Sequence, residues 1–277
     1  MTIDRFSAFT TISTGGNPAG VWIGDNLPDS QTMQQIAADI GFSETAFVVP
    51  KSGLNRTIRY YSPEGEVPFC GHATIATGVC LGENQGAGTY QLSTIVGVVP
   101  VVVNQLENGH WEAALTSVEP QHRSIENTIL LEALEALNWR LDELDLALPP
   151  SFAYAGSWHL VLAVKDYTRL ERLDYDFDRL KAFMILHQLT TLQLVWQKSP
   201  TIFHARNPFP VGGVIEDPAT GSAAAALGGY LRAIGYLPVP TKLLIYQGET
   251  LGRPSQLTVE IPQTGGIVVR GTAVRLQ

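Results

Sequence analysis

Residues 66–78 (EVPFCGHATIATG) and residues 216–228 (EDPATGSAAAALG) align without a gap and are identical at six of thirteen positions. Chance would give about one identity at residue frequencies of roughly 6–8%. Both stretches share the frame Glu-x-Pro-x-x-Gly. A repeat of this kind indicates two structurally similar halves, each carrying one such turn.

The segment that follows each turn is apolar almost all round, over residues 71–81 (GHATIATGVCL) and 221–231 (GSAAAALGGYL). A helix with this pattern is buried rather than amphipathic, and its small residues let strands approach its axis. We therefore predict an α/β (α+β) fold of two pseudo-symmetric halves, each a rolled mixed sheet wrapped around a central buried helix. The halves are predicted at 1–117 and 118–277, with a final strand, about 266–277, able to return to the first half.

Composition narrows the class of protein. The chain has 277 residues, of which 45% are hydrophobic and 16% charged, and its net charge is −8. Lys and Arg form no cluster, so nucleic acid and anionic membrane are not expected partners. The sequence begins without an apolar signal region, and no apolar run approaches the roughly 20 residues that span a bilayer. We expect a cytoplasmic protein that acts on a small molecule.

The two repeated turns are candidate anion sites. A helix N-terminus offers unpaired N–H groups and a partial positive charge, and a glycine there lets a ligand approach the backbone. Gly71-His72 and Gly221-Ser222 occupy these positions, so the two helix ends could grip one carboxylate. The alternative interpretation is that both glycines only permit a tight strand-to-helix turn.

Glu44 is the principal candidate acid or base. It lies between a predicted helix at residues 30–40 and a predicted strand at residues 45–49, within Phe42-Ser-Glu-Thr-Ala-Phe47. A carboxyl group among apolar residues tends to have a raised pKa, which suits proton transfer near neutral pH. The alternative is an exposed glutamate at a helix end.

Three further side chains near the turns have alternative roles. Asp217 is either a second acid/base or a helix cap, and His72 either donates to a substrate oxygen or is structural. Cys70 precedes a helix N-terminus, where a thiol can have a depressed pKa and act as base or nucleophile, or it is a small buried residue. Cys80 follows ten residues later on the same predicted helix and is interpreted as packing, too far from Cys70 for a disulfide.

Several chemistries have no motif in this sequence. The six histidines form no close pair with metal-ligand spacing, and there is no Cys-x-x-Cys, no dinucleotide fingerprint, no phosphate-binding Gly-x-x-x-x-Gly-Lys and no Gly-x-Ser-x-Gly. We accordingly predict an enzyme with no metal and no cofactor.

Five blocks of the sequence together resemble the PhzF-like proteins of the phenazine-biosynthesis type. They are Gly16-Asn-Pro-Ala-Gly-Val21, Phe42-Ser-Glu-Thr-Ala-Phe47, Cys70-Gly-His-Ala-Thr74, Glu216-Asp-Pro-Ala-Thr-Gly-Ser-Ala223 and Gly252-Arg-Pro-Ser255. The resemblance implies a fold similar to that of diaminopimelate epimerase, an active site between the halves, a homodimer and no cofactor.

The resemblance also implies a reaction. The best-understood family members isomerise a dihydro-hydroxyanthranilate by moving a proton, with the glutamate of the Ser-Glu-Thr block as acid/base. That glutamate corresponds to Glu44, and the residues that line the family's substrate site correspond to His72, Asp217 and Ser222.

The reaction that we predict is a proton shift on a small carboxylate-bearing metabolite, with backbone N–H groups at Gly71 and Gly221 stabilising developing negative charge. The alternatives are an epimerase or racemase that uses Glu and Asp, and a metabolite-binding protein without chemistry. A racemase with two thiols is not expected, because the second turn offers Ala219 and Thr220 but no cysteine.

Overall fold

The computed structural model describes residues 2–277, and its internal contacts divide the chain into two units. The first unit comprises the residues up to Thr116 together with Arg270–Gln277, and the second comprises Ser117–Val269. Most of the last strand, β17 (Val268–Arg275), therefore lies in the first unit.

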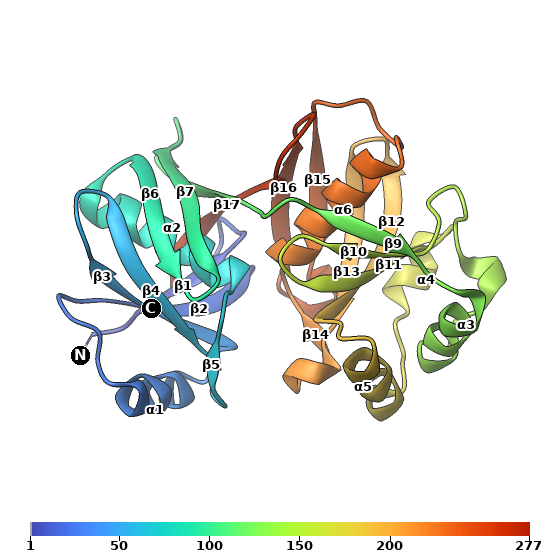
Figure 1. Cartoon of the computed structure of the whole chain (residues 1–277), viewed down its shortest axis with the longest axis horizontal. Helices are drawn as coiled ribbons and strands as arrows, with labels where there is room; N and C mark the ends of the chain where they lie inside the picture. The colour runs from blue at the N-terminus through green and yellow to red at the C-terminus, as the bar shows by residue number, and fades with distance from the viewer. Residues whose placement is uncertain (1) are drawn as a thin grey trace. The chain divides into compact units, whose positions relative to one another are not determined.

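The first unit contains a ring of strands with one helix inside and one outside (Figure 1). Its other elements are β1 (Asp4–Ala8), β2 (Asn17–Ile23), α1 (Ser30–Ile40), β3 (Glu44–Pro50), β4 (Asn55–Tyr61), β5 (Glu66–Val67), α2 (Gly71–Gln85), β6 (Gly88–Thr94), β7 (Gly97–Gln105) and β8 (Trp111–Thr116).

The strand pairing in this unit closes on itself. The order runs β1-β2-β3-β4-β6-β7-β8-β17 and returns to β1, with parallel pairing at β2–β3 and β4–β6. Helix α2 contacts strands β1, β2, β3, β7 and β8 from inside the ring, and every residue from His72 to Gly82 is buried. The predicted rolled mixed sheet around a central buried helix is confirmed.

Helix α1 packs on the sheet's other face. Its buried residues Met33 and Ala37 join Trp22, Phe47 and Tyr61 in a separate apolar cluster. Strand β3 is therefore covered on both faces, which explains why its central residues read as a continuous apolar run rather than an alternating one.

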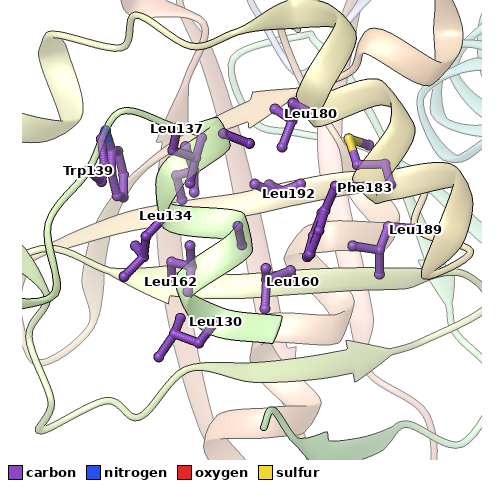
Figure 2. Close-up of a cluster of buried hydrophobic side chains, with 14 of the residues drawn as sticks. Leu130, Leu134, Leu137, Trp139, Leu160, Leu162, Leu180, Phe183, Leu189 and Leu192 are labelled. Carbon is purple, nitrogen blue, oxygen red and sulfur yellow. The ribbon is translucent and has the colours of Figure 1, made fainter. Parts of the chain in front are cut away.

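The second unit repeats this plan. Its elements are β9 (Gln121–Ser124), α3 (Asn127–Ala136), η1 (Leu141–Glu143), β10 (Ser151–Tyr154), β11 (Trp158–Ala163), α4 (Tyr167–Glu171), α5 (Phe177–Leu186), β12 (Thr191–Ser199), β13 (Ile202–Pro208), η2 (Pro210–Gly212), β14 (Glu216–Asp217), α6 (Gly221–Ala233), β15 (Thr241–Gln247), η3 (Glu249–Leu251) and β16 (Ser255–Ile261). Helix α6 contacts β9, β10, β11, β12 and β16, whereas α3 and α5 pack on the opposite face around Leu134, Leu160 and Phe183 (Figure 2).

The two units share the strand pattern on either side of the turn. In the first unit, β2 pairs with β3 in parallel, β3 with β4 antiparallel, and β4 with β6 in parallel. In the second unit, the pairs β11–β12, β12–β13 and β13–β15 have the same orientations in the same order. Within the turns, Tyr60 pairs with Val67 and Asn207 with Asp217, so the sequence repeat is also a repeat of strand register.

An arginine of the preceding strand holds the glutamate that begins each repeat. Arg59 Nη1 lies 3.2 Å from Glu66 Oε1, with both side chains about one-third exposed. At the equivalent place Arg206 grips Glu216 through Nε and Nη2, and the Glu216 side chain is fully buried. Arg206 also donates to the backbone oxygen atoms of Leu170 and Glu171.

The repeated glycines lie where each central helix approaches its sheet closely. A Cβ atom at Gly78 would lie 2.6 Å from Ala113 Cβ and 3.1 Å from Val101 Cγ1. A Cβ at Gly228, the equivalent position in α6, would lie 2.9 Å from Val259 Cγ1. The absence of a side chain at these positions is what lets the strands wrap so closely.

We expect Gly78→Ala to destabilise the protein although alanine is the better helix former. Helix propensity favours Ala over Gly by about 1 kcal/mol, whereas overpacking of a core costs about 1–3 kcal/mol. The matched control is Gly65→Ala, because a Cβ there meets nothing within 4 Å. Urea unfolding of both variants measures whether each substitution raises or lowers the free energy of unfolding. A stabilised Gly78→Ala variant would show that the strands do not pack this closely against the helix.

The two Arg–Glu pairs provide a second comparison. Arg206→Met leaves the buried Glu216 carboxylate without its partner, and breaking a buried pair costs about 3–5 kcal/mol. Arg59→Met removes the partly exposed equivalent and should cost at most about 1 kcal/mol. Denaturant unfolding of both variants checks the difference, and similar losses would contradict it.

Candidate active site

Glu44 lies at the start of β3, directly after the turn that ends α1. Gly41 ends that helix in the left-handed conformation, with φ of 69°, and the chain then enters β3 opposite Ala19 of β2. The Glu44 side chain is only 15% exposed. The alternative of an exposed helix-end glutamate is therefore excluded by the structure.

Burial raises the pKa of the Glu44 carboxyl above its usual value of 4.5. Hydrogen bonds from the Ser43 hydroxyl and the Cys70 thiol act in the opposite direction, because they favour the ionised form, but the cost of desolvation is larger. Folding therefore makes the Glu44 carboxyl harder to ionise than that of an exposed glutamate.

His72 lies in the first turn of α2 and contacts Glu44. Its Nε2 atom is 3.3 Å from Glu44 Oε2 and 3.3 Å from Ser43 Oγ, and the ring is buried. Because β3 carries Glu44 and the central helix carries His72, the close wrapping of the sheet around α2 brings the two together.

Cys70 completes this group. It is the N-cap residue of α2, and its Sγ lies 3.3 Å from His72 Nδ1 and 3.9 Å from His72 Nε2. The Glu44 carboxylate, the Cys70 thiol and the His72 imidazole each place a polar atom within 4.8 Å of the other two. The structure thus brings together three of the candidates from the first half, with Gly71 at the start of the same helix.

The backbone beneath Cys70 is fixed by buried hydrogen bonds. Thr74 Oγ1 donates to the Cys70 carbonyl at 2.6 Å, and the Tyr60 hydroxyl lies 2.7 Å from the same Thr74 oxygen. Cys80 lies elsewhere on α2, near Asp4, and burial raises the pKa of its thiol to about 12. Cys80 is therefore a protonated, buried residue, in agreement with its interpretation as packing.

The second turn carries the candidates Asp217, Gly221 and Ser222. Asp217 is buried, and its Oδ2 accepts a hydrogen bond from Thr220 Oγ1 at 2.5 Å. Gly221 begins α6 and is buried, whereas Ser222 is half-buried. These residues belong to the second unit, and their part in the same reaction as Glu44 stays a prediction.

Two residues that the sequence analysis missed organise these turns. Gln247, at the end of β15, is buried; its Oε1 accepts from the Thr220 N–H at 3.1 Å and its Nε2 donates to the Asp217 carbonyl at 2.7 Å. Ser43 contacts both Glu44 and His72. Ser43 stands in the Ser-Glu-Thr block and could have been singled out, whereas nothing local distinguishes Gln247.

Structural comparison defines the class of protein. A phenazine biosynthesis protein of the PhzF family from Bacillus anthracis has a TM-score of 0.87 at 25% identity, over 99% of this chain and 96% of that one. A hydroxyproline epimerase from Agrobacterium vitis has a TM-score of 0.70 at 12% identity, over 99% and 90% of the two chains, which is a likeness of fold alone. The fold is that of the diaminopimelate epimerase-like proteins.

Sequence comparison then gives the family. Residues 6–277 match the family described as phenazine biosynthesis-like protein, so the chain belongs to the PhzC-PhzF family, and it is a PhzF-like isomerase. A relative from Deinococcus radiodurans, named as an uncharacterized isomerase, is 34% identical over 97% of this chain and 87% of its own length. A trans-2,3-dihydro-3-hydroxyanthranilate isomerase from Pseudomonas fluorescens is 29% identical over 96% and 97%.

No helix within residues 2–277 is long and apolar enough to cross a membrane.

The raised pKa of Glu44 predicts a pH-dependent stability difference. A carboxyl whose pKa is raised by folding contributes stability below its unfolded pKa, and that contribution is lost as the pH rises through the folded value. Gln cannot ionise, so the stability of Glu44→Gln relative to the wild type should increase as the pH rises above about 4.5 and then level off.

Urea unfolding at a series of pH values measures this difference. Glu107→Gln, at an exposed turn position, is the matched control for the loss of one carboxyl group. A Glu44→Gln difference that stays constant or falls with pH would contradict the assignment of a desolvated carboxyl.

Proposed function

We propose that this protein catalyses a cofactor-independent proton shift on a small carboxylate-bearing metabolite, with Glu44 as the acid/base. The observation that carries the proposal is the buried Glu44 carboxyl with its raised pKa, in contact with His72 at the N-terminus of α2. Membership of a family whose relatives are named isomerases supports the reaction class.

Glu44 is suited to both steps of such a reaction. As carboxylate it accepts a proton from carbon, and as carboxylic acid it returns the proton to another atom of the same substrate. Because desolvation raises its pKa, the ionised form is a stronger base than the carboxylate of an exposed glutamate. General acid–base catalysis of this kind contributes about 10²–10⁴ in rate.

His72 and Ser43 would orient the Glu44 carboxylate. His72 Nε2 lies 3.3 Å from Glu44 Oε2 and 3.3 Å from Ser43 Oγ. His72 Nδ1 lies 3.3 Å from the Cys70 thiol sulfur. We assign to His72 the second catalytic role, donation of a hydrogen bond or proton to a substrate oxygen while Glu44 acts on carbon. Its fixed place in the first helical turn supports this role, since the buried imidazole is held with Nε2 3.3 Å from Glu44 Oε2 and Nδ1 3.3 Å from Cys70 Sγ.

The two helix N-termini are the proposed sites of negative charge. The first N–H groups of a helix have no acceptor within the helix, and Gly71 and Gly221 begin α2 and α6. We assign to these N–H groups, with Ser222, the binding of the substrate carboxylate and the stabilisation of charge that develops on it. Asp217 is assigned as the second acid/base at the α6 turn.

The aligned N-cap positions argue against a racemase with two thiols. Cys70 caps α2, and the equivalent N-cap residue of α6 is Thr220. A thiol base on one side of a substrate carbon would therefore have no thiol opposite it. An isomerase that moves a proton between two atoms on the same face of its substrate requires only one acid/base, which is Glu44.

We expect Glu44→Gln to lower turnover by about 10²–10⁴ while the protein still folds and binds substrate. The probe is trans-2,3-dihydro-3-hydroxyanthranilate, the compound in the name of the Pseudomonas fluorescens relative. The assay is run in D₂O, and mass spectrometry and NMR report the rate and position of deuterium incorporation. Glu107→Gln is the exposed control and should match the wild type.

The position of the deuterium separates the alternatives. Isomerisation places it at the receiving atom when the proton on Glu44 exchanges with solvent before it is returned, and gives the rearranged product without deuterium when it does not. Epimerisation places it at the original carbon with inversion, and a binding protein binds the probe without exchange or turnover. A folded Glu44→Gln variant that binds the probe and turns it over at the wild-type rate would refute the role proposed for Glu44.

A further inference from the structure

The carbonyl group of Cys70 and the N–H group of Gly71 belong to one peptide unit. The carbonyl accepts two hydrogen bonds, from the Thr74 N–H at 3.1 Å and from Thr74 Oγ1 at 2.6 Å. The Gly71 N–H begins α2 and has no acceptor within the helix. Because the peptide bond is conjugated, hydrogen bonds to the carbonyl oxygen withdraw electrons from the nitrogen and make this N–H a stronger donor.

A tyrosine extends this arrangement into a chain of hydrogen bonds. Tyr60 Oη lies 2.7 Å from Thr74 Oγ1, and both side chains are buried. A threonine hydroxyl has one proton, and Thr74 donates it to the Cys70 carbonyl, so the Tyr60 hydroxyl is the donor to Thr74. Burial raises the pKa of the Tyr60 phenol, which therefore keeps its proton. Hydrogen bonds in such a chain strengthen one another.

The Tyr60 ring is itself held in place. It packs edge-on against Phe69, with ring centroids 5.9 Å apart and an interplanar angle of 76°. Its strand, β4, pairs with β5, which leads into the turn before α2. The chain therefore starts on the sheet and ends at the first peptide of the helix, so it fixes the orientation of the Gly71 N–H relative to the strands.

The second half has the equivalent peptide without this chain. Strand register places Asn207 where the first half has Tyr60. The alignment of the repeats places Ala224 where the first half has Thr74. The Thr220 carbonyl accepts from the Ala224 N–H at 3.0 Å, but alanine has no hydroxyl to add a second bond. Tyr60 and Thr74 thus differ together between the halves, as expected of two side chains that act as one unit.

We propose that Tyr60 and Thr74 are positioning residues for the Gly71 N–H group. Acting through the Cys70 carbonyl, they orient and polarise this N–H as a donor to negative charge on the substrate. The polarised N–H stabilises charge that develops in the transition state more than charge already present on the bound substrate. The polarisation stands on the hydrogen bonds alone, whereas its effect on turnover rests on the function proposed above.

NMR measures the polarisation directly. Cys70-Gly71 is the only Cys-Gly pair in the sequence. Protein labelled with ¹³C at the cysteine carbonyl and with ¹⁵N in glycine therefore gives one cross-peak that contains both shifts. We expect Tyr60→Phe and Thr74→Val each to move the Cys70 ¹³C and Gly71 ¹⁵N shifts upfield. In the Thr74→Val background, Tyr60→Phe should add nothing, because the chain is already broken.

Tyr90→Phe is the matched control. Tyr90 is also fully buried, and its hydroxyl donates at 2.8 Å to the carbonyl of Gly86, at the other end of α2. This variant should leave the Cys70-Gly71 cross-peak unchanged. Unchanged shifts in Tyr60→Phe, with circular dichroism also unchanged, would overturn the polarisation. An equal shift in Tyr90→Phe would overturn it too, because it would show a general loosening of the helix.

The effect on turnover is measured with trans-2,3-dihydro-3-hydroxyanthranilate as the probe. We expect Tyr60→Phe and Thr74→Val each to lower kcat by about 2–10-fold, as the loss of one hydrogen bond predicts, with a smaller change in KM. Thr74→Ser keeps the hydroxyl and should restore most of the kcat that Thr74→Val loses. A purely structural role would lower the thermal midpoint and leave kcat unchanged.

The two measurements separate this proposal from the role of Glu44. If the shifts move in Tyr60→Phe while kcat does not, the chain polarises the peptide but the positioning role in turnover is wrong. If Tyr60→Phe is fully active while Glu44→Gln is inactive, only the positioning role is wrong. If Glu44→Gln is fully active, the function proposed for Glu44 is wrong instead, and the NMR shifts still decide the polarisation.

Discussion

The structure depends on enclosing a helix inside a sheet. A helix with strands on nearly all sides has no polar face, so α2 and α6 consist mostly of small and apolar residues, with Gly78 and Gly228 at positions where strands come close. The cost of this arrangement is a helix that would be unstable alone, since alanine and glycine bury little area and glycine disfavours helices. Closure of the strand ring β1-β2-β3-β4-β6-β7-β8-β17 holds α2 in place.

Enclosure of the helix also determines the chemistry at its N-terminus. The first turn of α2 must emerge beside strands that surround it, and this places His72 and Cys70 against Glu44 at the start of β3. The same burial that stabilises the helix removes water from the carboxyl and raises its pKa. The packing of the helix and the raised pKa of Glu44 are therefore consequences of one constraint.

The sequence alone was sufficient to predict the features that occur at matching positions in both halves. The ungapped match of residues 66–78 with 216–228 predicted the two central helices and their turns, and the apolar surroundings of Glu44 predicted its burial; the structure confirms both. The Arg–Glu pairs escaped detection, because Arg59 precedes Glu66 by seven residues and Arg206 precedes Glu216 by ten. Gln247 also escaped detection, because its role arises only from pairing β15 beside β13, a contact far apart in sequence.

The two turns show how one backbone frame acquires different chemistry. Strand register places Val67 and Asp217 at equivalent positions, and Cys70 and Thr220 are the equivalent N-cap residues of α2 and α6. The first turn thus carries a thiol and an imidazole, whereas the second carries a carboxylate that accepts from the Thr220 hydroxyl, with the Gln247 amide on the Asp217 backbone carbonyl. Because the backbone N–H groups at both helix ends come from the fold itself, they persist through such substitutions. What differs between the halves is therefore the set of side chains at the turn, and Glu44, which has no counterpart within either repeated segment, is contributed by the strand outside the turn.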